Sequence, residues 1–312
     1  MKAGRRGPRQ LASPLLAELG YEAGDRVVIV HADDVGMCHS TLPALDDLLE
    51  CGVLKSASAM VPCPWFPAVA ERCRRAPAVD MGVHLTLTSE WSCYRWRPLS
   101  TTDPASGLLD EEGYFPRTRE ALAERAAPAA VAREIRAQLD TALAAGIDVT
   151  HLDSHMFALF QPALLPLLAR LAAEYRLPVP LWRPDAGSAL ARDFAGVPGG
   201  FRASCEAWDM PLLEKVEVLS LRPTAEPRRE VAWRMLASSP AGISQLIIHP
   251  ACDSPELRAM TPHWQARVAD YEIFADPALG ERLRRQGVHL AGYRQLREAL
   301  RRGTAARSGA EP

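Results

Sequence analysis

Short apolar runs alternate with amphipathic helical segments along most of the chain. Residues 27–30 and 79–88 are rich in β-branched side chains and are typical of strands, whereas 128–146 repeats its apolar positions with the period of a helix and ends at a glycine. Seven or eight segments of the chain are strand candidates, and predicted helices separate them. Strands that alternate with helices over a whole chain indicate an α/β fold with mainly parallel strands.

Ionisable side chains occur where several of these strands end. The first strand leads into His31 and the adjacent pair Asp33 and Asp34, the strand at 79–88 contains His84, and a late apolar strand ends at His249. Ligands of α/β proteins bind at the carboxyl ends of strands. This pattern favours a TIM-barrel-like (β/α) barrel over an open doubly wound sheet, and no glycine-rich nucleotide-binding motif follows the first strand.

The periodicity predicts a single barrel domain over residues 25–302. We expect residues 1–24 to form a basic leader and a short helix, and 303–312 to be a disordered tail. Residues 89–127 interrupt the pattern with an aromatic-rich irregular insertion, which is long enough to be a lid or a binding wall. Its tryptophans either pack the insertion onto the body or stack on a sugar ring.

Composition excludes some classes of partner. The 312 residues carry a formal net charge of −2, so nucleic acid is not an expected ligand. Seven cysteines are scattered without a CxxC pair, which argues against a disulfide framework or a thiolate zinc site and favours a reducing cytoplasm. No stretch approaches the ~18 apolar residues of a membrane span. A homodimer is compatible with the sequence.

The adjacent acids Asp33 and Asp34 are costly at a buried strand end. Neighbouring carboxylates raise one another's pKa unless a cation or a buried proton relieves them, so the pair suggests a metal site or acid–base chemistry. A solvated Asp-Asp turn explains the pair alone equally well. Adjacent strand residues point to opposite faces, so both acids reach one site only if the backbone turns, and Val35-Gly36 offers such a turn.

His151, Asp153 and His155 have the two-residue spacing that places them on one face of a strand. They could be buried polar groups that satisfy one another. So many polar groups on an otherwise apolar strand are nevertheless expensive to desolvate without a cation.

Asp34, His84 and His155 come from three different strands and could bind one divalent metal ion. One carboxylate and two neutral imidazoles suit zinc and leave positions open for water and substrate. A metal-bound water is a nucleophile for hydrolysis once a base takes its proton. Asp33 is the candidate base, and His249 could protonate a leaving amine.

Four segments, HADDVG, GVHLTLT, THLDSH and IIHP, occur in this order between residue 27 and about residue 300. Together they resemble the YdjC-like carbohydrate deacetylases, the family of chitooligosaccharide deacetylase and the hopanoid-associated deacetylases. The resemblance implies a TIM-barrel-like fold and metal-dependent removal of an N-acetyl group from an amino sugar or glycoconjugate. We expect one divalent metal ion, either zinc or magnesium. The resemblance also assigns Asp33 as the base, Asp34, His84 and His155 as metal ligands, and His249 to the active site.

His155 is preferred over His151 as a ligand because it lies nearer the carboxyl end of its strand. His151 and Asp153 then become candidates for supporting the ligands. Arg183 lies at another predicted strand end, where it could contact substrate or a carboxylate, or serve the scaffold.

The chain departs from the family after DSH, where it continues with the apolar run 156–160 instead of a longer His-rich run. We hypothesise a wall suited to a short glycan or to a sugar on an apolar aglycone. Two other functions fit the same residues: a catalytically inactive metal- or sugar-binding barrel protein, and a metal-dependent esterase. The absence of an Arg or Lys cluster weakens a phosphoester substrate.

Overall fold

The computed structural model describes residues 14–182 and 210–308. Its main sheet consists of β1 (Arg26–Val35), β2 (Ser56–Ala59), β3 (Met81–Leu85), β4 (Val149–Ser154), β7 (Lys215–Val218), β8 (Gly242–Ile248) and β9 (Val288–Leu290). The order is β4-β3-β2-β1-β8-β7, with β9 paired to the start of β1, and every pair is parallel. A separate parallel pair joins β5 (Leu181–Trp182) to β6 (Leu212–Leu213).

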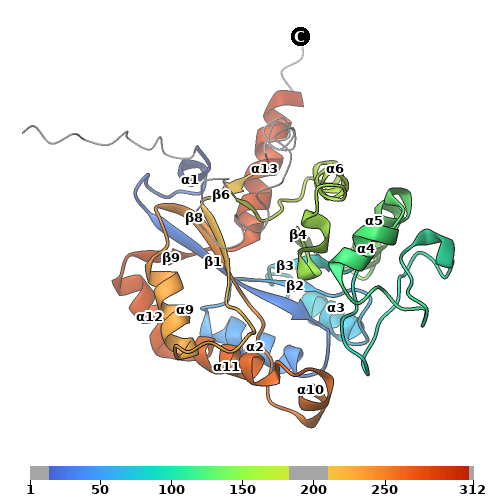
Figure 1. Ribbon diagram of the computed structural model, residues 1–312. Coiled ribbons are helices and arrows are strands. Elements are labelled where there is room, and N and C mark those ends of the chain that lie inside the picture. Colours follow the sequence, from blue (N-terminus) through green and yellow to red (C-terminus); the bar gives the residue numbers. More distant parts are fainter. Residues whose placement is uncertain (1–13, 183–209, 309–312) are drawn as a thin grey trace, which may run out of the picture.

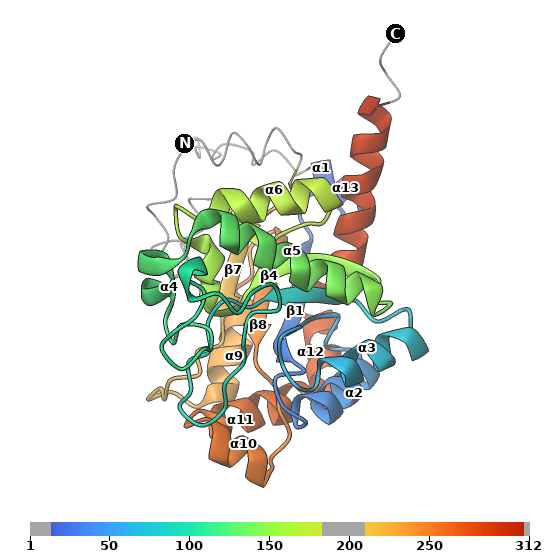
Figure 2. The same cartoon turned by 90° about the vertical axis from the view of Figure 1, so that its right-hand side faces the viewer.

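Helices cover the outside of this sheet (Figure 1). They are α1 (Pro14–Glu18), α2 (Thr41–Cys51), α3 (Phe66–Arg75), α4 (Arg119–Arg125), α5 (Pro128–Ala144), α6 (Leu165–Tyr175), α9 (Arg228–Ala237), α10 (Pro255–Met260), α11 (Trp264–Phe274), α12 (Pro277–Arg285) and α13 (Tyr293–Ser308). Helices α5 and α6 lie against each other, and α13 projects from the body beside α1 (Figure 2). Within the described ranges, no helix is long and apolar enough to cross a membrane.

The expected α/β architecture with parallel strands is confirmed. Among the described residues, β4 and β7 end the strand order without pairing with each other, so the strands form a half-barrel. The structure adds α4 and α10, two short helices that the sequence pattern does not predict. The last helix continues to Ser308, whereas the sequence analysis expects disorder from residue 303.

Alternate residues of β1 face two different cores. Val28 belongs to the large core between the sheet and the outer helices, whereas Val27 and Ile29 pack on the inner face with residues of β7, β8 and α13. The same alternation continues along β1 to His31 and Asp33, both buried. The inner face is therefore apolar where β1 begins and polar where it ends.

The insertion is irregular apart from a 3-10 turn, η1 (Pro104–Ser106), and α4. Trp96 and Phe115 are buried, and the Trp96 indole donates a 2.7 Å hydrogen bond to the carbonyl of Thr88. Packing onto the body is thus confirmed for Trp96. Trp91 packs beside it but also lines the cavity described below.

A backbone turn at the end of β1 brings the two adjacent acids to the same side. Asp34 has φ 63°, in the left-handed region, and Gly36 follows with φ 84°. The β1–β2 pairing also shifts register between Ala32 and Val35. The turn expected at Val35-Gly36 is present and starts one residue earlier, at Asp34.

Replacement of Gly36 tests the importance of this turn. A Cβ there would lie 2.9 Å from Val69 Cγ2, and an L-residue disfavours φ 84°. Gly36→Ala should lower the free energy of unfolding by about 1–3 kcal/mol in urea denaturation. Gly24→Ala is the matched control, because nothing lies within 4 Å of its added Cβ. Equal stability of the two variants would contradict a strained turn.

Candidate metal centre

Three strand ends meet around one carboxylate oxygen. Asp34 Oδ1 lies 3.3 Å from His84 Nε2 and 3.1 Å from His155 Nδ1. All three residues are buried, and one potential ligand atom from each lies within 4.8 Å of the others. The predicted convergence of these residues is therefore present, and the group could hold a metal ion.

The ring of His84 is oriented by an acid behind it. Its Nδ1 lies 2.8 Å from Asp153 Oδ1, and Asp153 Oδ2 accepts a 2.8 Å hydrogen bond from the Ser58 hydroxyl. A neutral His84 that donates from Nδ1 presents the lone pair of Nε2 to the site. Asp153 thus orients a candidate ligand, which is the kind of role predicted for it from the sequence.

Glu90 has the same relation to His155. Its Oε2 lies 3.1 Å from His155 Nε2, so a proton donated there leaves Nδ1 free to face Asp34. Glu90 is not predicted from the sequence, because it belongs to the irregular insertion. Its position just after the strand segment 79–88 is the signal that could have identified it.

Arg267 of α11 holds the other oxygen of Asp34. Its Nη2 donates a 2.7 Å hydrogen bond to Asp34 Oδ2, and the guanidinium is buried. Within the described residues, its Nε and Nη1 have no hydrogen-bond partner. Nothing in the sequence pattern distinguishes Arg267 from other helical arginines.

The two candidate histidine ligands have raised pKa values, so they hold their protons tightly when no metal ion is bound. Burial lowers the pKa of His155, but the carboxylates of Glu90 and Asp34 outweigh burial and raise it to about 9. Burial likewise lowers the pKa of His84, whereas Asp153 and Asp33 raise it well above its usual value. The pKa of Asp34 is well below its usual range, because Arg267 and His155 overcome the effect of burial. The negative charge around these histidines therefore favours any cation.

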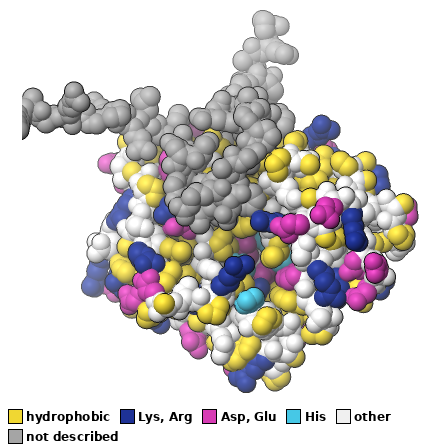
Figure 3. Space-filling view, viewed as in Figure 1, with side chains coloured by type: hydrophobic (Ala, Val, Ile, Leu, Met, Phe, Trp, Pro, Cys, Tyr) yellow, Lys and Arg dark blue, Asp and Glu magenta, His cyan; other side chains and the backbone are white. Residues whose placement is uncertain are grey.

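A cavity of about 610 Å³ opens onto this cluster. Figure 3 shows histidine and acidic side chains within a hollow on this face of the molecule. Asp33 lines the cavity with Oδ2 at 3.8 Å from His84 Nε2. His249 also lines it, and its Nδ1 is buried with no hydrogen-bond partner in the described part of the chain.

One side of the cavity is apolar. Met156 and Phe157 follow His155 with φ 54° and 53°, and the Met156 side chain is exposed. Further apolar lining residues are Val216, Val218, Leu221, Met235, Ile247 and Pro262. The apolar wall expected from residues 156–160 is present, formed by its first two residues.

Two further candidates lie elsewhere. His151 is fully buried and does not line the cavity, and its Nε2 contacts His31 rather than the cluster of Asp34, His84 and His155. His155 belongs to the group with Asp34 and His84 that could hold a metal ion, whereas His151 forms a different group with His31 and Asp153. Arg183 lies outside the described residues.

Comparisons with known proteins place these observations in a family. The model of the YdjC-like protein family matches residues 27–285. A carbohydrate deacetylase of Thermus thermophilus is 37% identical over 295 residues, which cover 92% of this chain and 99% of that protein. A carbohydrate deacetylase of Geobacillus stearothermophilus is 27% identical and covers 87% of this chain and 98% of its own length.

A solved structure has the same fold. It is a protein of Enterococcus faecalis V583 whose description proposes cellobiose-phosphate cleavage. Its TM-score is 0.72 at 24% identity, and the match covers 87% of this chain and 99% of that one. The family match and the Thermus relative each extend over most of the chain, and the chain therefore belongs to the YdjC-like protein family.

Proposed function

We propose that this protein is a metal-dependent hydrolase that removes an N-acetyl group from an amino sugar or glycoconjugate. The observation that carries the proposal is the convergence of Asp34, His84 and His155 beside Asp33 at the floor of one cavity. The relatives named carbohydrate deacetylase support the substrate class.

The donor set fits a divalent cation. His84 and His155 each face a carboxylate with one nitrogen and the cluster with the other, an arrangement common among metal-binding histidines. Asp34 would be the third ligand. Two imidazoles favour zinc, although magnesium remains an alternative. When bound, the metal would lower the pKa of a water molecule and polarise the acetyl carbonyl.

Asp33 and His249 would manage the protons of the reaction. We assign Asp33 to accept a proton from the attacking water, because its Oδ2 lies at the cavity edge of the cluster. His249 would donate a proton to the leaving nitrogen, so that water and amide become acetate and amine. Its Nδ1 is not engaged by any described residue.

The cavity can take a sugar. Its volume of about 610 Å³ is in the usual range for small-molecule sites, and Trp91 provides an aromatic face on which a sugar ring could stack. The described cysteines are free, which is consistent with the proposed cytoplasmic location. The alternatives are a catalytically inactive sugar-binding barrel and an esterase with the same site.

Asp33→Asn should separate catalysis from metal binding. Loss of the base should reduce acetate release from diacetylchitobiose by about 10²–10⁴-fold, while one equivalent of zinc still binds. Acetate can be measured by a coupled assay and zinc by calorimetry. Wild-type protein that binds zinc but releases no acetate from any N-acetylated sugar would favour the inactive barrel, and faster release from acetyl esters would favour the esterase.

Metal affinity should depend on pH because the cation must displace protons. With the pKa of His155 at about 9 in the metal-free protein, zinc binding below pH 9 releases a proton. The apparent affinity should therefore rise about tenfold per pH unit for each displaced proton between pH 6 and about pH 9. Calorimetry in two buffers with different ionisation enthalpies counts the protons. An affinity that is constant over this range would contradict the proposed ligands.

The apolar wall predicts a preference among substrates. An N-acetylglucosaminide with an apolar aglycone should be deacetylated with a higher kcat/KM than free diacetylchitobiose, because Met156 and Phe157 can bury the aglycone. Met156→Gln should reduce this preference without changing activity on the free sugar. A clear preference of the wild type for the free sugar would exclude this role of the wall.

A further inference from the structure

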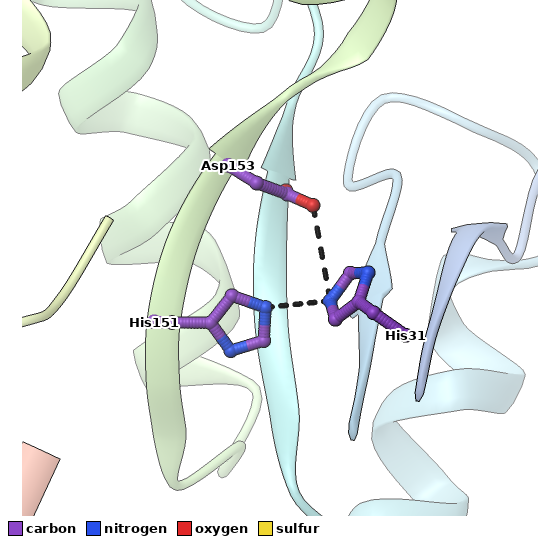
Figure 4. Close-up of side chains that lie close together, drawn as sticks. All are labelled: His31, His151 and Asp153. Atoms are coloured by element: carbon purple, nitrogen blue, oxygen red, sulfur yellow. Dashed lines mark hydrogen bonds and ion pairs between the residues drawn. The ribbon is translucent and has the colours of Figure 1, made fainter. Parts of the chain in front are cut away.

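A continuous chain of hydrogen-bonding groups leads from Asp33 into the interior of the half-barrel. His31 Nδ1 lies 2.7 Å from Asp33 Oδ1. The other ring nitrogen, His31 Nε2, lies 2.8 Å from His151 Nε2 (Figure 4). On the far side of its ring, His151 Nδ1 lies 3.0 Å from the Thr150 hydroxyl, which donates a 2.5 Å hydrogen bond to Asp80 Oδ1. His31, His151 and Thr150 are completely buried.

Asp80 fixes the direction of this chain. Its Oδ1 accepts from the hydroxyls of Thr150 and Ser56, and its Oδ2 accepts from the backbone N–H of Arg294 at the start of α13. Since the single hydroxyl proton of Thr150 goes to Asp80, Thr150 can only accept from His151 Nδ1–H.

The orientation of His31 follows from this order. Burial and the neighbouring His31 hold the pKa of His151 well below its usual value, so His151 is neutral and carries one proton. With that proton on Nδ1, its Nε2 must accept from His31 Nε2–H. For the 2.7 Å contact between His31 Nδ1 and Asp33 Oδ1 to be a hydrogen bond that leaves Asp33 a carboxylate, His31 must donate from Nδ1 as well.

The surrounding fold holds the two rings in place. Tyr293 stacks on His151 with ring centroids 4.1 Å apart. A Cβ at Gly82 would lie 2.4 Å from His151 Cε1, so only glycine leaves room for this ring. From the sequence, His31 is noted only as an ionisable side chain at a strand end, and Gly82 and Asp80 receive no role.

A second metal ion is the competing explanation of these residues, because His31, His151 and Asp153 also form a group that could hold one. The contacts of these residues argue against it. The two Nε2 atoms are 2.8 Å apart, which is a direct hydrogen bond and shorter than the ~3.3 Å between nitrogens on a tetrahedral zinc. Asp153 Oδ2 is 3.9 Å from His31, and both oxygens of Asp153 already contact His84 or Ser58.

We propose that His31 is a positioning residue for the deacetylation reaction, whose own orientation is set through His151 and Thr150 by Asp80. His31 holds one oxygen of Asp33 so that the other faces the cavity and the attacking water. This inference rests on the proposed function, because Asp33 acts there as the base. Loss of these hydrogen bonds should lower kcat and leave KM nearly unchanged. The reason is that Asp33 is the one member of the hydrogen-bonded chain that lines the cavity.

Three substitutions of His31 test the contact with Asp33. Asparagine places an amide N–H where His31 has Nδ1, whereas glutamine can reach only toward His151. We expect His31→Ala and His31→Gln to lose about 10–100-fold in kcat, and His31→Asn to recover most of that loss, with KM within about threefold in each case. Thermal unfolding of each variant monitors the fold. Equal losses in all three variants at equal stability, or losses confined to KM, would overturn the proposal.

The direction of these hydrogen bonds can be measured without an activity assay. Nitrogen chemical shifts of His151 in the full-length protein should show the proton on Nδ1. In Asp80→Asn, the new carbonyl must face the Arg294 N–H, so the amide NH₂ donates to Thr150 and the proton of His151 should move to Nε2. The proposed direction of the hydrogen bonds would be overturned if wild-type His151 carried its proton on Nε2. It would also be overturned if the position of this proton did not change in Asp80→Asn.

Two further results separate the explanations. Zinc titration should reach one equivalent in wild type and in His151→Gln. If wild-type protein bound a second equivalent of zinc and His151→Gln did not, the hydrogen-bonded chain would be overturned in favour of a second metal site. If the wild type releases no acetate, the proposed function fails, and the position of the His151 proton still decides whether the chain has the stated direction.

Discussion

Compensation of buried negative charge is the constraint on which the rest of the site depends. The carboxylates of Asp33, Asp34, Asp153 and Glu90 lie around two histidines, with Arg267 as the buried permanent cation in contact with Asp34. Buried charges are stable only when they are paired and hydrogen-bonded. The raised pKa values of His84 and His155 express this demand, and a divalent cation would meet it with the same ligands.

The fold meets this demand through the geometry of parallel strands. Because β1, β3 and β4 run in the same direction, their carboxyl ends deliver acids and imidazoles to one place. The left-handed conformation of Asp34 then turns the second acid toward the histidines, while Asp33 keeps the alternation of β1 and stays on the inner face with His31. The two adjacent acids therefore contact different partners. Asp34 contacts the candidate ligands His84 and His155, and Asp33 contacts His31.

Much of this arrangement is predictable from the sequence, because it depends on periodicity and on polar residues at strand ends. The parallel α/β fold and the meeting of Asp34, His84 and His155 follow from such local signals. Glu90 and Arg267 do not, since one lies in an irregular insertion and the other on a helix whose packing depends on the whole fold. The hydrogen-bonded chain to Asp80 likewise joins residues distant in sequence. Its direction requires knowledge of the actual donors and acceptors.

The most direct test of the account is the position of a metal ion in crystals grown with zinc. An anomalous difference map at the zinc edge locates the ion independently of any assay. The account predicts one strong peak between Asp34 Oδ1, His84 Nε2 and His155 Nδ1, with Arg267 still bonded to Asp34. A peak between His31 and His151, or zinc bound only at the surface with this cluster unchanged, would contradict it.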